Sequence, residues 1–171
     1  MTSADDTPTQ SANTTPTTGT TTGTTSCPPT ALSSGPATSQ VAVVTTAAPS
    51  APGGSDLAVR TEIVVISDGP RVIARPTWSA LEVLGRGAVV ARATGSDGPD
   101  VPTPLTRGTT MPAQTVPTKI RLTGCDGQAL PPGAYRLRAL VGYGSDALNN
   151  AQGGASRAFV MASEPVDLTI T

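Results

Sequence analysis

Apolar and polar residues alternate with a period of two through most of the chain after residue 40. In the segment 57–67, Leu57, Val59 and Ile63 fall on one face of an extended strand, whereas Arg60 falls on the other. No segment carries an apolar stripe at the 3.6-residue period of an amphipathic helix. The alternation therefore predicts an all-β protein.

The same pattern recurs between turns that are rich in Gly and Pro. The turn Gly85-Arg86-Gly87 lies between two β-rich runs and predicts a hairpin, because glycine supplies the positive φ that a tight turn needs. About seven to eight short strands with this punctuation predict an immunoglobulin-like β-sandwich. Strands are expected over 41–46, 57–67, 71–75, 80–84, 88–92, 116–123, 134–141 and 156–171, and Pro165 is expected to break the last one as a bulge or a strand switch at a sheet edge.

Two further segments lie between these strands, and one residue, Trp78, has an expected position. The Pro-rich stretch 98–115 is expected to cross between the two sheets, and 145–152 can form one helical turn in a loop. Trp78, the single tryptophan of the chain, is expected in the core rather than at a recognition surface.

Residues 1–26 differ in composition from the rest of the chain. The run from Thr14 to Thr25 consists of Thr with one Pro and two Gly, and no aliphatic residue larger than alanine occurs between Met1 and Leu32. Such a segment cannot bury enough apolar area to offset the entropy lost on ordering. We therefore expect a disordered linker over 1–26 and one sandwich domain over 27–171.

Composition excludes several classes of function. The chain has no histidine, which rules out a Ser-His-Asp triad, a Cys-His dyad and imidazole zinc ligands. The 11 basic and 12 acidic residues nearly cancel and Lys119 is the only lysine, so nucleic acid is not an expected partner. Only 2% of the residues are aromatic, which disfavours a stacking platform for bases or sugars.

Cys27 and Cys125 are the only cysteines and are too far apart for a CxxC redox or metal motif. One alternative is that they are two unrelated buried thiols. Both, however, lie beside polar turn sequence, where a free thiol would be exposed, and this favours a disulfide. Asp126 follows Cys125 directly and would raise the pKa of a thiol there, which disfavours a nucleophilic role.

The compartment follows from the cysteines and the N-terminal segment. No stretch is long and apolar enough to span a bilayer, and the N-terminus lacks the charged and apolar regions of a signal peptide. The chain is therefore either a cytosolic protein with a disordered start or the mature form of an exported protein. A structural disulfide favours the second interpretation, an extracellular or cell-envelope location.

The C-terminal half resembles a known group of proteins. Residues 122–127, Leu-Thr-Gly-Cys-Asp-Gly, and 130–139, Leu-Pro-Pro-Gly-Ala-Tyr-Arg-Leu-Arg-Ala, are similar to a pattern in exported actinobacterial lipoproteins that carry an Ig-like domain of unassigned function. The resemblance covers about residues 80–171. It implies Cys27 as the partner of Cys125 and a membrane tether through a lipidated N-terminus. At the Pro-Gly-x-Tyr corner, the Tyr135 hydroxyl is expected to cap the backbone.

No arrangement of residues points to catalysis. Asp97 and Asp100 share a loop that lacks the alternating ligands of a calcium site, and no Gly-x-Ser-x-Gly or Ser-x-x-Lys motif occurs. The sequence therefore predicts no catalytic residues, no cofactor and no metal.

The segment 142–157 is the candidate binding loop, since Ig-like domains commonly place binding determinants on such connections. The alternative is a solvated loop without a role. The residues selected for testing are Tyr143, Leu148, Asn149, Asn150 and Arg157.

Three functions are consistent with these features. The leading hypothesis is a non-catalytic, envelope-tethered or secreted Ig-like module that binds a protein or a cell-wall polymer. The second is a protease-inhibitor-like module that inserts a loop such as 142–157 into a protease. The third is a hydrolase that uses carboxylates such as Asp97, Asp100 and Asp126.

Overall fold

The computed structural model describes residues 25–30, 41–66, 73–95, 103–104, 107–113, 115–145 and 157–171. Every regular element in these ranges is a strand, so the all-β prediction is confirmed. The strands are β1 (Val41–Ala47), β2 (Ser50–Ala51), β3 (Asp56–Val65), β4 (Ile73–Gly85), β5 (Ala88–Thr94), β6 (Thr103–Pro104), β7 (Thr110–Pro112), β8 (Lys119–Arg121), β9 (Gly133–Ser145), β10 (Arg157–Ala162) and β11 (Val166–Ile170).

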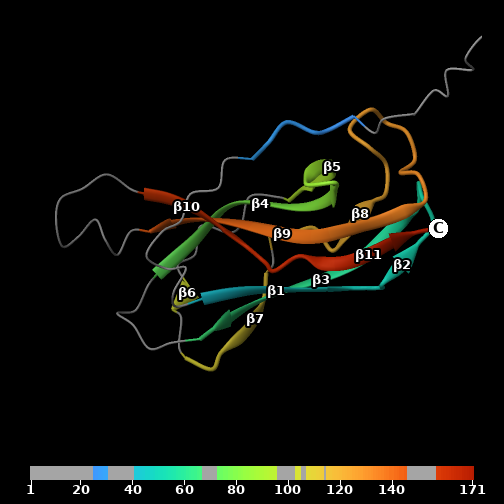
Figure 1. The fold of residues 1–171 in the computed structure, drawn as a ribbon. Helices are drawn as coiled ribbons and strands as arrows, with labels where there is room; N and C mark the ends of the chain where they lie inside the picture. Colours follow the sequence, from blue (N-terminus) through green and yellow to red (C-terminus); the bar gives the residue numbers. More distant parts are fainter. Residues whose placement is uncertain are drawn as a thin grey trace, which may run out of the picture.

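These strands form two sheets that pack face to face (Figure 1). The first sheet has the order β1-β3-β7, and β8 also pairs with β3. The second has the order β2-β11-β9-β4-β5, with β10 added to β9 and β6 added to β4. All pairs are antiparallel except β2 with β11. The two-layer arrangement is that of a β-sandwich.

The core lies between the sheets and is built from the alternation in the sequence. In β3 every second residue from Leu57 to Val65 is buried, as the period-two pattern predicts. The opposite sheet contributes the inward residues of β4 and β9, whose register places Leu81 beside Ala139 and Val83 beside Leu137. The cluster includes Val41, Val43, Leu57, Val59, Ile63, Leu81, Val83, Ile120, Leu122, Leu137, Val141, Leu168 and Ile170.

Several strand boundaries differ from the prediction. Residues 73–75 of the strand expected over 71–75 are the start of the 13-residue β4. β4 continues through Pro76, and its register with β9 shifts between Pro76 and Trp78. The expected strand over 116–123 is only Lys119–Arg121. The described strands number eleven rather than seven or eight, since β2, β6, β7 and β8 have only two or three residues each.

Two expectations about connections are confirmed. The segment 98–115 does cross between the sheets, because β6 pairs with β4 and β7 pairs with β3. The break at Pro165 separates β10 from β11, and both pair with β9, so the chain remains in one sheet across the break. Residues 1–24 of the linker expected over 1–26, and residues 146–152 of the helical turn expected over 145–152, lie outside the described residues, whereas Ser145 belongs to β9.

Trp78 is not part of the interior cluster. Its side chain is only partly buried. Trp78 lies on the same side of β4 as Ala80 and Glu82, and its register partner on β9 is Gly142. The core residues Leu81 and Val83 lie on the opposite side. The expectation of a core tryptophan is therefore wrong, because the strand that contains it places even-numbered residues on the outer face of the sheet.

Candidate functional site

One carboxylate is completely buried in the described part of the chain, and it lies on the outer face of the second sheet. Glu82 lies three residues before the end of β4 and has a relative exposure of 0%. Its register neighbours are Arg92 on β5 and Arg138 on β9. Side chains directly opposite one another on neighbouring strands are in contact range, so the sheet itself brings the three charged groups together.

The two guanidinium groups bind the carboxylate from both sides. Arg92 donates from Nε and Nη2 to Oε1 of Glu82, at 3.0 and 2.7 Å. Arg138 donates from Nε and Nη2 to Oε2, at 2.9 and 2.7 Å. Each arginine side chain is only 19% exposed. We refer to Arg92, Glu82 and Arg138 as the Arg-Glu-Arg cluster.

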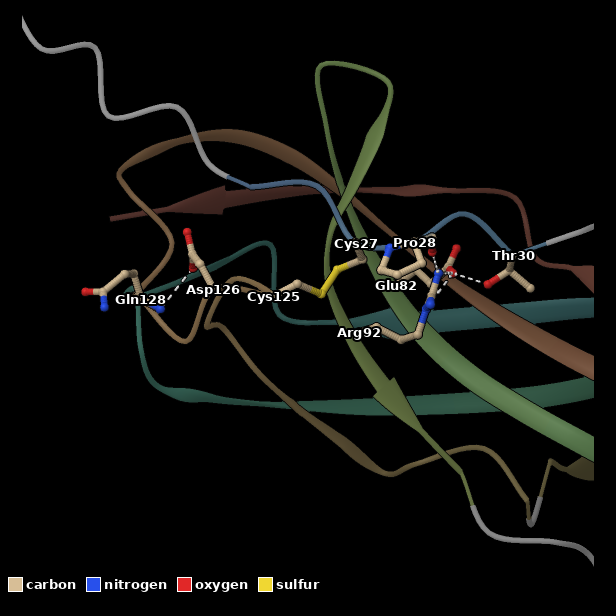
Figure 2. Close-up of a disulfide and its surroundings, with 8 residues drawn as sticks. All are labelled: Cys27, Pro28, Thr30, Glu82, Arg92, Cys125, Asp126 and Gln128. Carbon is tan, nitrogen blue, oxygen red and sulfur yellow. Dashed lines mark hydrogen bonds and ion pairs between the residues drawn. A yellow bond between two sulfur atoms is a disulfide. The ribbon is translucent and has the colours of Figure 1, made fainter.

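A short N-terminal segment, 25–30, lies over this cluster (Figure 2). The Thr30 hydroxyl donates to Oε1 of Glu82 at 3.0 Å, and Nη2 of Arg92 also donates to the Pro28 carbonyl at 2.7 Å. Every charged oxygen of Glu82 thus has at least two donors, which compensates for its loss of hydration.

A disulfide fixes the same segment to the domain. Cys27 and Cys125 are bonded with a Cα–Cα distance of 5.4 Å and are 98 residues apart in sequence, which confirms the predicted pair. Both half-cystines also donate backbone hydrogen bonds to the edge of β5, Cys27 N to Val89 O at 2.6 Å and Cys125 N to Val90 O at 3.1 Å. Figure 2 shows the disulfide beside the contacts of Arg92 and Thr30.

The cluster keeps Glu82 ionised. Burial alone raises the pKa of the Glu82 carboxyl, but hydrogen bonds from Arg138, Arg92 and Thr30 and the charge of Arg138 together lower it by more. The net pKa lies below the ordinary value of 4.5. A carboxylate that is ionised and bound by two arginines is a poor proton acceptor, so its chemistry here is to hold three strands and the segment 25–30 together.

The predicted corner before β9 has the expected contact. The Tyr135 hydroxyl donates to the Pro131 carbonyl at 2.9 Å. The ring of Tyr135 lies against Gly85, since a Cβ at Gly85 would be 3.1 Å from Cε1 of the tyrosine. The corner therefore joins the start of β9 to the hairpin between β4 and β5.

The candidate binding residues divide into two groups. Tyr143 belongs to β9, where it pairs with Phe159, and Arg157 begins β10, where it pairs with Ser145. The strands thus continue to 145 and resume at 157, so the connection is shorter than the expected 142–157. Leu148, Asn149 and Asn150 lie outside the described residues, as do Asp97 and Asp100. Asp126 is exposed, and its Oδ1 accepts a hydrogen bond from Gln128 N at 3.0 Å.

Sequence reasoning missed the Arg-Glu-Arg cluster. The signal was a single carboxylate inside the apolar run Ala80-Leu81-Glu82-Val83-Leu84, and an arginine in each of the two strands that flank it. A charged residue in such a run marks either an exposed face or a buried ion pair, and only the strand register distinguishes them.

The described residues show neither a metal-binding cluster nor a membrane-spanning helix. No group of three or more His, Cys, Asp or Glu side chains there could hold a metal ion. In the same ranges, no helix has the length and apolar character required to cross a bilayer.

Comparison of the chain with protein-family models, with curated proteins and with solved structures finds no match.

Proposed function

We propose that the protein is a non-catalytic, immunoglobulin-like module of the cell envelope or the secreted fraction, and that it binds a protein or a cell-wall polymer. The observation that carries this proposal is the Cys27–Cys125 disulfide, which joins the N-terminal segment to the sandwich. Disulfides form and persist in oxidising compartments outside the cytoplasm. The resemblance of residues 80–171 to exported actinobacterial lipoproteins supports the same location, with a lipidated N-terminus as the tether.

The strand order supports an Ig-like assignment. In the second sheet β11, β9, β4 and β5 follow one another as strands G, F, C and C′ do in a variable-type immunoglobulin domain. The Tyr135–Pro131 hydrogen bond at the start of β9 has the form of the tyrosine corner at the start of strand F.

The Arg-Glu-Arg cluster supports a scaffold role. Glu82 is the only buried charged residue among the described residues, and its oxygens accept hydrogen bonds from Arg92, Arg138 and Thr30. The cluster stabilises the sheet from which the β9–β10 connection extends. We propose that connection as the binding determinant, with Tyr143, Leu148, Asn149, Asn150 and Arg157 as its residues.

The location is tested by trapping thiols in intact cells. Cells are treated with a membrane-permeant maleimide before lysis, and the intact protein is analysed by mass spectrometry together with cell fractionation. We expect no maleimide adduct and recovery with the envelope or the medium. Two adducts on a protein recovered with the cytosol would refute the proposed location.

The binding determinant is tested with isolated cell envelopes. The five residues are replaced together by alanine, and retention of the purified chain on the envelopes is measured by sedimentation. We expect a loss of at least about tenfold in affinity. The matched control replaces Arg121 and Gln128, which are exposed near the opposite end of β9, and should retain full binding. Equal binding by both variants would exclude the β9–β10 connection.

A further inference from the structure

The edge strands of the two sheets differ in length and in whether their outward backbone groups are hydrogen-bonded. At the β5 edge of the second sheet, the Val89 and Val90 carbonyls accept hydrogen bonds from the two half-cystines. At the other end of this sheet, β2 has only two residues. The first sheet ends at the seven-residue strand β1, and among the described strands only β3 pairs with it. β1 is therefore the longest edge strand without a second pairing strand among the described residues.

The hydrogen bonds of β3 define which backbone groups of β1 face this edge. Val65 N donates to Thr109 O, and Ala113 N donates to Thr61 O, so the odd-numbered residues of β3 bond away from β1. Residues of an antiparallel strand alternate between its two sides, so Glu62 and Val64 bond toward β1. Arg60 does so by the same alternation, and the register partners of Val64, Glu62 and Arg60 on β1 are Ala42, Val44 and Thr46.

The remaining residues of β1 consequently direct their N–H and C=O groups outward. These residues are Val41, Val43, Thr45 and Ala47. None of the backbone hydrogen bonds found outside the strand ladders in the described residues involves them. Unpaired groups in a row are a template for the addition of another strand.

The sequence of β1 has none of the features that usually prevent such addition. The strand reads Val-Ala-Val-Val-Thr-Thr-Ala, without a charge or a proline, and its pairing with β3 is continuous. Its central residue, Val44, is 44% exposed. Ile66 directly follows β3 and is 50% exposed, and Val44 and Ile66 are the exposed large hydrophobic residues among the described residues.

We propose that two copies of this chain associate through β1, in antiparallel orientation about a two-fold axis at Val44. This register pairs Val43 with the partner's Thr45 and Val41 with the partner's Ala47, so that every outward backbone group of the strand is bonded. Val44 then lies directly opposite the partner's Val44 in a non-hydrogen-bonded pair, where side chains are closest.

Two properties of β1 favour a second copy of the chain as its partner, namely its lack of charge and its complete pairing in the symmetric register. The strand is neutral, so the two-fold brings no like charges into the ladder, and its seven residues leave no outward group unpaired in this register. A shift of the axis by one residue in either direction would leave at least one terminal residue of each strand without a partner. The proposal is independent of the ligand proposed above.

The register is tested by disulfide cross-linking of the full chain. Val44→Cys adds the only free thiol, because Cys27 and Cys125 are already bonded. A non-hydrogen-bonded antiparallel pair has Cα atoms about 4.5 Å apart, within the range of a disulfide. Thr46→Cys is the matched control, since the two Thr46 residues would be offset by about 13 Å along the strand. We expect Val44→Cys to form a covalent dimer under mild oxidation and Thr46→Cys to remain monomeric.

Association itself is measured by sedimentation velocity over a concentration series. We expect the unmodified chain to dimerise reversibly, and Val44→Lys to weaken the dimer by at least about tenfold by placing two ammonium groups opposite each other. Thr94→Lys, at an exposed strand position in the other sheet, should leave association unchanged. Circular dichroism checks that both variants are folded.

Three results would overturn the proposal. The first is a chain that stays monomeric at all concentrations and does not cross-link through Val44→Cys. The second is equal cross-linking by Thr46→Cys, which would place the axis elsewhere. The third is a dimer that Val44→Lys does not weaken.

Discussion

Glu82 remains charged inside the protein because its neighbours compensate for the water that it loses. Each carboxylate oxygen accepts two hydrogen bonds from one guanidinium group, and Oε1 accepts a third from Thr30. Removing one member of a buried ion pair usually costs more than the pair contributes, because the remaining charge is left buried and unpaired. Here the single carboxylate of Glu82 compensates the charges of both Arg92 and Arg138.

Glu82→Gln should therefore lower the free energy of unfolding by about 3 kcal/mol at neutral pH. Urea denaturation provides the measurement. The control is Glu62→Gln, which removes an exposed ion pair with Arg60 and should cost less than about 1 kcal/mol. Equal effects of the two substitutions would contradict a stabilising role for the buried cluster.

The pH dependence of this contribution has a defined sign. The folded pKa of Glu82 is lower than its ordinary value of 4.5, so the unfolded chain binds more protons in the acidic range. The stabilisation is fully present above about pH 4.5 and is lost as pH falls through the lower folded pKa. The stability difference between the unmodified chain and Glu82→Gln should accordingly shrink on acidification, and a difference that grows instead would contradict this.

Two buried hydroxyl groups have the opposite effect on stability. Thr45 and Thr61 are register partners on β1 and β3, both are buried, and neither Oγ1 has a hydrogen-bond partner. Thr45→Val and Thr61→Val keep the shape and remove the unsatisfied group, so each should stabilise the chain by about 1 kcal/mol. Thermal unfolding measures this, with the exposed Thr94→Val as control; destabilisation by both core substitutions would refute the expectation.

At the scale of the element, the corner before β9 determines where the longest central strand begins. Pro131 and Pro132 cannot continue a strand ladder, and Gly133 adopts a φ of 158° at the first residue of β9. Tyr135 then returns its hydroxyl to Pro131. The corner thus positions the residues of β9 against β4 and β11.

Tyr135→Phe should cost about 1 kcal/mol, because it removes this hydrogen bond and keeps the ring. Tyr135→Ala should cost about 2 kcal/mol more, since it also uncovers Gly85 and the adjacent core. Urea denaturation of both variants separates the two contributions. Equal losses would assign the whole effect to the hydroxyl group.

At the scale of the whole molecule, the disulfide connects the N-terminal segment 25–30 to the turn that contains Cys125, in the C-terminal half of the chain. It closes a loop of 98 residues, which contains both sheets in part. Such a bridge removes conformational freedom from the unfolded chain, by about 4.7 kcal/mol for a loop of this size in the chain-entropy model. Its second effect is to keep Thr30 and Pro28 over the Arg-Glu-Arg cluster.

These two effects can be separated by a double-mutant comparison. Replacing Cys27 and Cys125 by alanine should destabilise the domain by several kcal/mol, up to about 4.7. Thr30→Val should cost about 1 kcal/mol in the disulfide-bonded chain and much less in the cysteine-free chain, where the segment is free to leave Glu82. The same Thr30→Val cost in both backgrounds would show that the segment stays bound without the bridge.

Local sequence patterns were sufficient for most strands. The alternation from Leu57 to Val65, the Gly85–Gly87 turn and the break at Pro165 depend on contacts or backbone limits that act within a few residues. Local patterns predicted less where the pairing partner of a segment is distant in the sequence. The strand expected over 116–123 is shortened to three residues, and Trp78 lies on the outer face, because pairing partners and register determine these features.

The sequence by itself determined the all-β class and the buried face of β3, because a side-chain period of two is a property of the extended backbone. It also indicated the cysteine pair, because only two cysteines occur. Only the tertiary structure decided that Glu82 is buried between Arg92 and Arg138, and that β1 ends a sheet with its outward groups uncovered by the described residues. Both are consequences of strand order and register, which arise from contacts between residues far apart in the chain.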